Sequence, residues 1–230
     1  MQSVKEQCST VLEEQQVSQE KEFTVPEPKP VYDICKRIFD LVMATFALIV
    51  LSPLFLIVAI AIKLEDGGNV IYGSTRLTKG GKEFTMYKFR SMCIDAEKKL
   101  DDLMQYNEMD GPAFKMADDP RITKVGSFIR KTSIDELPQL INIILGDMTI
   151  IGPRPPLPRE VEQYNAYQMH RLDVKTGLAC YHECMGRSDN PDFDEWVEQD
   201  LRYIRERSMK TDIKIIFMTI KVVLTGKGAM

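Results

Sequence analysis

The sequence predicts an α/β protein that is mostly helical and carries a small β-hairpin or sheet, with its N-terminal part bound to a membrane. Three observations indicate this class. Residues 41–62 are apolar and uncharged, short apolar and aromatic runs surround Gly80 and Gly81, and apolar residues at helical spacing fill most of the later chain. The expected segments are a flexible acidic tail and linker at 1–32, a membrane helix at 33–66 and a folded domain at 67–230.

Composition limits the class of protein further. The chain has 230 residues, of which 44% are hydrophobic, so it can form one globular domain with appendages. Its net charge is -4 and its basic residues are dispersed, which predicts no nucleic-acid partner. The five cysteines are scattered and no cleavable signal precedes them, so we expect reduced thiols in the cytosol and no disulfide framework.

The first 30 residues are polar and acidic, and they end in the proline-spaced run VPEPKP. This composition is typical of a flexible tail joined to the next element by a linker. We therefore expect this part to fold little by itself.

The apolar run at 41–62 has 22 residues and would be about 33 Å long as a helix, enough to cross a bilayer core. Pro53 cannot donate to the carbonyl of Ile49, and the hydroxyl of Ser52 could satisfy part of the broken ladder, so a sharp bend is expected there. Basic residues flank both ends. Since the positive-inside rule then gives no preference for opposite sides, a hairpin that enters and leaves on the cytoplasmic face and a straight single pass both remain open.

The middle of the chain predicts a hairpin followed by two amphipathic helices. Residues 70–92 give the two strands and their glycine turn, and Lys88 lies near the end of the second strand, either as a solvated edge charge or as a ligand. Residues 94–109 and 121–131 have helical apolar spacing, and the second helix is basic. Both suit a membrane interface, and the second also brings Arg130 next to the segment that follows.

Three more helices are expected beyond the proline-rich turn at 152–156, over residues 159–175, 194–208 and 213–224. A break at Thr176 and Gly177 separates the first helix from a short apolar stretch. A glycine turn further on presents Arg187.

Two adjacent carboxylates, Asp135 and Glu136, precede an apolar helical run that stops at Gly146, ahead of a short strand. A plain explanation is helix capping, because the segment matches the S-x-x-E capping box that begins at Ser133. With Ser133 as N-cap, Pro138 deletes a bond that the helix should have, whereas with Asp135 as N-cap no bond is lost. Capping therefore remains open beside a chemical role.

The basic residues around this pair suggest phosphate chemistry. An aspartate that attacks the β-phosphorus of a nucleotide diphosphate sugar needs an oriented carboxylate, a divalent cation and donors for the equatorial oxygens. Asp135 could serve as the nucleophile, and Asp135 with Glu136 could hold Mg²⁺, which takes oxygen ligands. The candidate phosphate clamps are the basic residues Lys88, Arg130, Arg154 and Arg187. A membrane segment beside such a site indicates a lipid partner.

Five stretches make this sequence similar to a known family. They are KRIFD, the Ser52-Pro53 pair, FTMYKFRSM, DPRITKVGSFIRKTSIDELPQLINIILGDMTIIGPRPPLP and GRSD. The chain resembles the bacterial sugar transferases, the monotopic polyprenyl-phosphate phosphoglycosyl transferases of the undecaprenyl-phosphate hexose-1-phosphate transferase type. The likeness runs from about residue 36 to the C-terminus.

The resemblance implies a reaction. Members transfer a sugar 1-phosphate from a UDP-sugar to undecaprenyl phosphate and release UMP, with Mg²⁺ as cofactor and a phosphosugar ester on the aspartate that matches Asp135. Glu136 matches its partner. The basic site residues of the family are matched by Lys88, Arg130, Arg154 and Arg187. The reaction is the first membrane step of surface polysaccharide or glycan assembly, ahead of downstream glycosyltransferases.

The resemblance also implies a topology. Residues 33–66 would form a re-entrant helix that bends at Ser52 and Pro53 and does not cross the membrane. Residues 67–230 would then be a cytosolic catalytic domain on the cytoplasmic face of the bacterial inner membrane, in contact with inner membrane lipid. A homodimer is compatible with this arrangement.

The chain departs from the family pattern at residues 175–183, where a proline and a tryptophan are absent near Arg187. The nucleotide or sugar contacts of that loop are therefore open. Two other functions also remain as alternatives. One is a membrane-bound phosphatase that uses the same aspartate, and the other is a non-catalytic, membrane-anchored interaction module.

Overall fold

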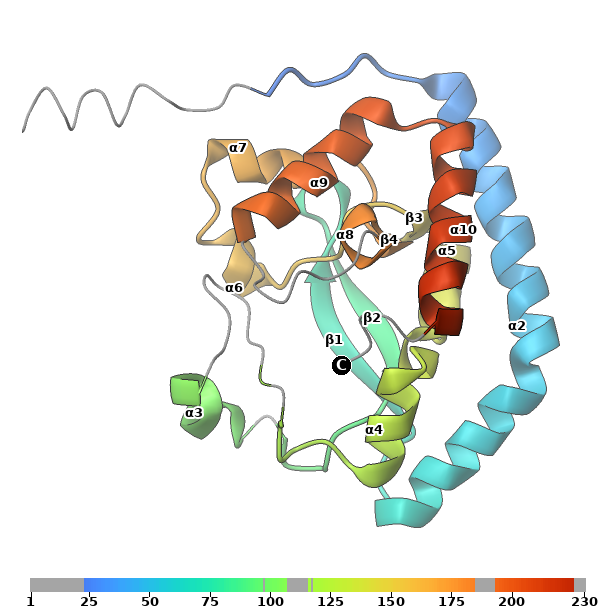
Figure 1. Cartoon of the computed structure of the whole chain (residues 1–230), viewed down its shortest axis with the longest axis vertical. Coiled ribbons are helices and arrows are strands. Elements are labelled where there is room, and N and C mark those ends of the chain that lie inside the picture. Colours follow the sequence, from blue (N-terminus) through green and yellow to red (C-terminus); the bar gives the residue numbers. More distant parts are fainter. Residues whose placement is uncertain (1–22, 97, 107–115, 117, 185–192, 226–230) are drawn as a thin grey trace, which may run out of the picture.

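Figure 1 shows the protein in a computed structural model, which describes residues 23–96, 98–106, 116, 118–184 and 193–225. One long helix, α2 (Pro30–Asp66), runs along the outside of a folded body made of short helices and two small sheets. This architecture confirms the mostly helical class with a small sheet. The predicted acidic tail falls mostly outside the described residues.

The body is built from many short elements. In chain order these are β1 (Ile71–Leu77), η1 (Lys79–Gly81), β2 (Glu83–Phe89), α3 (Leu100–Leu103), η2 (Met104–Tyr106), α4 (Lys124–Lys131), η3 (Ile134–Glu136), α5 (Gln139–Leu145), β3 (Thr149–Ile151), α6 (Pro158–Val161), α7 (Ala166–Met169), η4 (His170–Leu172), β4 (Gly177–Ala179), α8 (Tyr181–Cys184), α9 (Phe193–Glu206) and α10 (Met209–Thr225). The prefix η marks a 3₁₀ helix, whose tighter turn suits such short pieces.

Helix α2 stays continuous through Pro53, and Figure 1 shows it changing direction about halfway along its length. The hydroxyl of Ser52 donates to the carbonyl of Ile49 at 2.8 Å, which is the acceptor that the proline leaves without its usual donor. The predicted role of the Ser52 hydroxyl is therefore confirmed. The helix ends at Gly67, whose φ of 74° is the left-handed conformation that glycine adopts readily.

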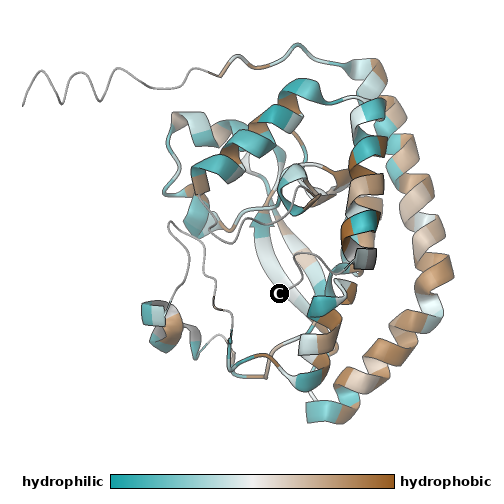
Figure 2. Cartoon of the chain, in the orientation of Figure 1, coloured by the Kyte–Doolittle hydropathy of each residue, from teal (hydrophilic) through white to brown (hydrophobic). Residues whose placement is uncertain are grey.

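The surface of α2 is apolar over most of its length, as the brown ribbon in Figure 2 shows. Only Asp40, Ala44, Val58 and Ile62 of this helix are buried against the body. By length and composition, α2 is the one helix in the described part of the chain that could cross a membrane. An exposed apolar surface of this extent is typical of a helix that contacts lipid or another protein.

The predicted hairpin is confirmed. Strands β1 and β2 pair antiparallel, with Ile71 opposite Phe89. The turn between them contains Gly80 and Gly81, with φ values of 70° and 76°, which explains why the sequence has glycine at both positions.

Helix α5 packs between α2 and β2. A cluster of buried side chains joins Ala44 of α2, Met86 of β2 and Ile143 of α5. Asn142, which is fully buried, adds two hydrogen bonds to the hairpin: its Oδ1 accepts from the Tyr87 backbone N–H at 2.9 Å, and its Nδ2 donates to the Thr85 carbonyl at 2.7 Å. This amide fixes the distance between α5 and the strand that carries Lys88.

We therefore expect Asn142→Ala to destabilise the protein by about 1–3 kcal/mol, because the buried amide is lost and the partly buried Tyr87 N–H and Thr85 carbonyl lose their partner. Chemical denaturation of the detergent-solubilised protein measures this change. The matched control is Gln163→Ala, which removes an exposed amide whose one hydrogen bond to a described residue goes to the Arg159 carbonyl. That control should change stability by less than about 0.5 kcal/mol, and an equal loss in both variants would refute the structural role of Asn142.

The second sheet pairs β3 with β4 in parallel, and it joins segments on either side of the proline-rich turn. The sequence predicted β3 but only an apolar stretch at β4, whose run of Gly, Leu and Ala has no β-branched or aromatic residue to indicate a strand. A Cβ on Gly177 would lie 2.1 Å from the Gly152 nitrogen, so this close approach requires glycine.

Two predicted helices are shorter or broken in the structure. Within residues 94–109, the described part forms turns up to α3 and η2, so a single long helix was the wrong prediction. Residues 159–175 form α6, α7 and η4 instead of one helix. The chain restarts at Asn165, whose side chain accepts from the Gln168 N–H and caps α7. The helices predicted at 121–131, 194–208 and 213–224 are confirmed as α4, α9 and α10.

Candidate active site

The carboxylate pair lies in η3, on a strained turn between α4 and α5. Ser133 has a φ of 55°, the one positive φ outside glycine among the described residues, and its side chain makes no capping bond. Helix α5 begins only at Gln139, after Pro138. Both capping explanations are therefore wrong, because an N-cap residue needs an extended backbone and a side-chain bond to the first turn. Left-handed strain of this kind costs about 1–3 kcal/mol and is concentrated at functional sites.

Asp135 is 8% exposed and forms no ion pair within the described part of the chain. Burial raises the pKa of this carboxyl from 3.8 to about 6, and the neighbouring Glu136 acts in the same direction. Lys88 and Arg130 oppose the shift, so both cations lie close enough to act on Asp135. The carboxylate is thus ionised at neutral pH but poorly solvated, which is the condition of a reactive group.

Glu136 is held differently from its neighbour. Its Oε1 accepts from the Lys88 ammonium at 2.6 Å, and both side chains are only partly exposed. Lys88 reaches it from the end of β2, where the strand passes η3. The hairpin therefore delivers a cation to the carboxylate pair, and the reading of Lys88 as a solvated edge charge is wrong.

Arg130 lies in the last turn of α4, where a cation also suits the helix dipole. Its Nη1 is buried and has no hydrogen-bond partner among the described residues. A buried guanidinium nitrogen without a partner costs free energy, and an anion bound beside Asp135 would offset this cost.

Arg76 belongs to the same region, although in the sequence it is only one of several basic residues that follow the apolar run. Its guanidinium donates to Ser74 Oγ and to the Pro155 carbonyl, both at 3.0 Å. Burial and the charge of Arg154 lower the pKa of Arg76 to about 10, and the charge of Glu136 opposes this shift. Two close arginines favour an anion between or beside them. No signal in the sequence distinguished Arg76, because its burial depends on the fold.

Arg154 is exposed and lies over the ring of Trp196, 5.4 Å from the ring centroid. His182 stacks on the same tryptophan with a centroid distance of 5.0 Å and an interplanar angle of 18°. The segment that departs from the family pattern thus supports Arg154 through Trp196. Arg187, the remaining predicted phosphate ligand, lies outside the described residues.

The structure thus brings four of the predicted residues together: Lys88, Arg130, Asp135 and Glu136. Arg154 is connected to this group through Arg76, because the charges of Arg154 and Glu136 both act on Arg76. Asp135 and Glu136 provide adjacent carboxylate oxygens, the donors that Mg²⁺ prefers. No group of three or more potential metal-ligating side chains (His, Cys, Asp or Glu) occurs in the part of the chain that the structure describes. The pair therefore fits a Mg²⁺ that takes its other ligands from water and substrate phosphate, as is usual for this ion.

Comparison with known proteins decides the family. The sequence profile of the bacterial sugar transferases matches residues 31–226, which is most of the chain. The chain belongs to the bacterial sugar transferase family. The match includes α2, both sheets and the carboxylate pair, and it confirms the resemblance seen in the sequence.

Individual sugar transferases are similar over the same part of the chain. The galactosyl transferase CpsE of Streptococcus agalactiae serotype III (strain NEM316) is 47% identical over 85% of this chain and 43% of that protein. The exopolysaccharide production protein ExoY of Sinorhizobium fredii (strain NBRC 101917 / NGR234) is 40% identical over 87% of this chain and 90% of its own length. The undecaprenyl-phosphate galactose phosphotransferase of Salmonella typhimurium is 41% identical over 84% of this chain and 41% of that protein. The chain thus spans less than half of two of these relatives and most of the third.

Proposed function

We propose that the chain is a phosphoglycosyl transferase that moves a sugar 1-phosphate from a UDP-sugar to undecaprenyl phosphate, as a first membrane step of glycan assembly. The observation that carries this proposal is the arrangement of a buried, ionisable Asp135 beside Lys88 and Arg130, with a guanidinium nitrogen of Arg130 left without a partner. The printed name of the Salmonella relative supports the class of acceptor.

In the first step, a carboxylate oxygen of Asp135 attacks the β-phosphorus of the UDP-sugar. The bond from this phosphorus to the oxygen that bridges the two phosphates breaks, and UMP leaves with that oxygen and the electron pair. A phosphosugar ester then remains on Asp135. Because Asp135 is poorly solvated, it needs little desolvation before it attacks. Arg130 and Lys88 stabilise the charge on the oxygens of the transferred group.

In the second step, a phosphate oxygen of undecaprenyl phosphate attacks the phosphorus of this ester. The bond to the Asp135 oxygen breaks, which restores the carboxylate and gives undecaprenyl-diphosphate-sugar. Asp135 and Glu136 would hold the Mg²⁺, which neutralises diphosphate charge when it is bound. Lys88 keeps Glu136 in place through the 2.6 Å bond.

The same proposal includes the membrane topology. We infer that α2 enters and leaves the inner membrane on its cytoplasmic face, with the bend at Ser52 and Pro53 inside the lipid. Large apolar side chains are also exposed on α4, α5 and α10, among them Phe128 at 63%, Leu145 at 63% and Phe217 at 68%. These three helices could lie at the interface, where the lipid acceptor is found. A homodimer and contact with downstream glycosyltransferases remain open to experiment.

The direct test is UMP release by the purified full chain with a panel of UDP-sugars, with and without undecaprenyl phosphate. We expect continuous UMP release only when both the lipid and Mg²⁺ are present, and none after chelation by EDTA. A phosphatase using the same aspartate would release free sugar phosphate or phosphate without the lipid. An anchored interaction module would release nothing, so the three functions give three different results.

The raised pKa of Asp135 predicts the pH dependence of the first step. The nucleophile must be ionised, so the rate should fall as the pH falls through about 6. One pH unit below this pKa, only about a tenth of the carboxyl is still ionised. The first UMP released without lipid is the proper readout, because undecaprenyl phosphate is a phosphate monoester whose own second pKa is about 6. Lys88→Gln should move the midpoint upward, since Lys88 lowers this pKa. A rate independent of pH from 5 to 8 would contradict the assignment of Asp135.

A further inference from the structure

A cavity of about 210 Å³ lies where α2 begins, at the end of α5 that points away from Asp135. Residues of α2, η1, β3 and α9 line it, together with the segment ahead of β4. Arg37, one of the lining residues, donates to the last carbonyls of α5, those of Ile143 at 2.5 Å and Ile144 at 2.9 Å. Since α5 has seven residues and is roughly 10 Å long, this cavity is separate from the carboxylate pair.

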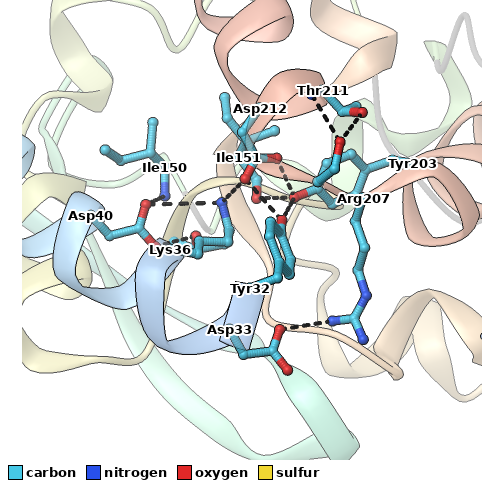
Figure 3. A network of polar contacts seen from close by, with 12 residues as sticks. Tyr32, Asp33, Lys36, Asp40, Ile150, Ile151, Tyr203, Arg207, Thr211 and Asp212 are labelled. Carbon is cyan, nitrogen blue, oxygen red and sulfur yellow. Dashed lines mark hydrogen bonds and ion pairs between the residues drawn. The ribbon is translucent and has the colours of Figure 1, made fainter. Parts of the chain in front are cut away.

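The carboxylates around the cavity are already bonded, as Figure 3 shows. Asp40 accepts from Thr149 Oγ1 at 2.5 Å and from the Ile150 N–H at 3.2 Å. Asp212 accepts from the Tyr32 hydroxyl at 2.8 Å and from Lys36 at 3.0 Å. Both carboxylates are almost completely buried, at 3% and 1% exposure. They stabilise the wall and do not offer free negative charge to a ligand.

The cations of the cavity are less well compensated. Lys79 and Lys175 are exposed and have no ion pair or hydrogen bond within the residues described. Arg207 pairs with the half-exposed Asp33 at 3.2 Å, but its Nε is buried and has no partner among the described residues. The three cations therefore have unused capacity to bind an anion.

The positive charges also lie close to one another. A Cβ on Gly146 would stand 3.3 Å from Arg37 Nη2 and 3.9 Å from Lys175 Nζ. Burial lowers the pKa of Lys175, and the charges of Arg37 and Lys79 act in the same direction. The carboxylates of Asp40 and Asp147 offset part of this repulsion, and a bound anion would relieve it further.

We propose that this cavity binds a phosphate group, held by Lys79, Lys175 and Arg207. Its volume equals about seven waters at ~30 Å³ each, which is enough for a phosphate with part of its hydration shell. The cavity lies beside the turn of α2 that precedes the apolar run, so an inserted α2 sets it at the depth of lipid head groups. The phosphate can come from an anionic phospholipid or from solution, and the same experiment separates these sources.

The test measures how fast each lysine of the full chain is acetylated by a limiting amount of an N-hydroxysuccinimide ester, with the modified peptides quantified by mass spectrometry. One arm adds inorganic phosphate to protein in detergent, against chloride at equal ionic strength. The other compares phosphatidylcholine vesicles with and without phosphatidylglycerol. Lys82 is the internal control, because it ends the same turn as Lys79 and is 72% exposed.

When the anion that binds is added, we expect the acetylation rates of Lys79 and Lys175 to fall at least about fivefold. The acetylation rate of Lys82 should change less than about twofold. Protection by phosphatidylglycerol alone identifies a lipid head group, and protection by inorganic phosphate identifies a soluble anion. In Lys175→Gln the protection of Lys79 should be lost, whereas Lys82→Gln should retain it. Absence of protection in both arms, or equal protection of Lys82, overturns the proposal. UMP release is independent of this result, so either proposal can fail alone.

Discussion

Replacing Asp135 by Asn should reduce UMP release on the order of 10⁴-fold or more, because the amide cannot form the phosphosugar ester. The same substitution keeps the size and shape of the side chain, so the fold should remain intact. Steady-state assays with Mg²⁺, a UDP-sugar and undecaprenyl phosphate measure the loss. Normal turnover by the variant would contradict the assignment of the nucleophile.

The same variant should be more stable than the parent protein at pH 7.5. Because burial raises the folded-state pKa of Asp135 from 3.8 to about 6, its protonated form contributes stability that is fully present below pH 3.8 and is lost as the pH rises through 6. At pH 7.5 the ionised carboxylate therefore destabilises the folded protein by about 1–3 kcal/mol. The uncharged Asn side chain does not have this effect. Denaturation at pH 7.5 and at pH 4 should show the difference at the higher pH only.

Asp147→Asn is the matched control. This aspartate follows the other end of α5, is partly exposed, and pairs with Lys82 at 3.7 Å. It should keep full activity and lose at most about 1 kcal/mol of stability, since surface ion pairs contribute little. An equal loss of activity in both variants would mean that α5 is perturbed, and not that a nucleophile is missing.

Replacing Arg130 by Gln should lower kcat/KM about 10²–10³-fold, which is typical when one donor to a developing charge is removed. Stability should change little or increase, because the buried Nη1 has no partner to lose among the described residues. The comparison of kcat/KM with the free energy of unfolding separates this role from a structural one.

Two controls make the Arg130 result specific. Arg130→Lys keeps the charge but not the planar fork, so it should recover only part of the activity. Arg159→Gln removes an exposed arginine of α6 and should leave activity within about twofold, as expected for a surface residue. A full recovery by lysine would show that charge alone matters, and a loss in the Arg159 variant would refute the role proposed for Arg130.

Local sequence signals were sufficient for several elements. The Ser52-Pro53 pair predicted the bend of α2 and the hydroxyl bond to Ile49, because proline removes a known donor at a known position. The glycines at 80 and 81 predicted the hairpin turn, since both adopt positive φ. These features depend on a few neighbouring residues, and the rest of the fold does not alter them.

The details of the site depended on contacts that are distant in the sequence. Ser133 matched a capping box, yet its left-handed backbone and the late start of α5 at Gln139 exclude capping. Arg76 was one basic residue among several until burial beside Pro155 and Arg154 made it part of the site. The three-residue strand β4 forms only because β3 pairs with it. Such features follow from tertiary packing, which no local pattern records.

Covalent modification of Asp135 can be detected in a single-turnover experiment without lipid. The full chain would be mixed with Mg²⁺ and a UDP-sugar, with UDP-galactose as the first choice from the name of the Salmonella relative, and quenched in acid. We predict one UMP released per chain and the mass of a phosphosugar on the peptide that contains Asp135, which disappears when undecaprenyl phosphate is added. If the protein turns over with lipid, yet releases no UMP and carries no adduct without it, then Asp135 does not form a covalent intermediate.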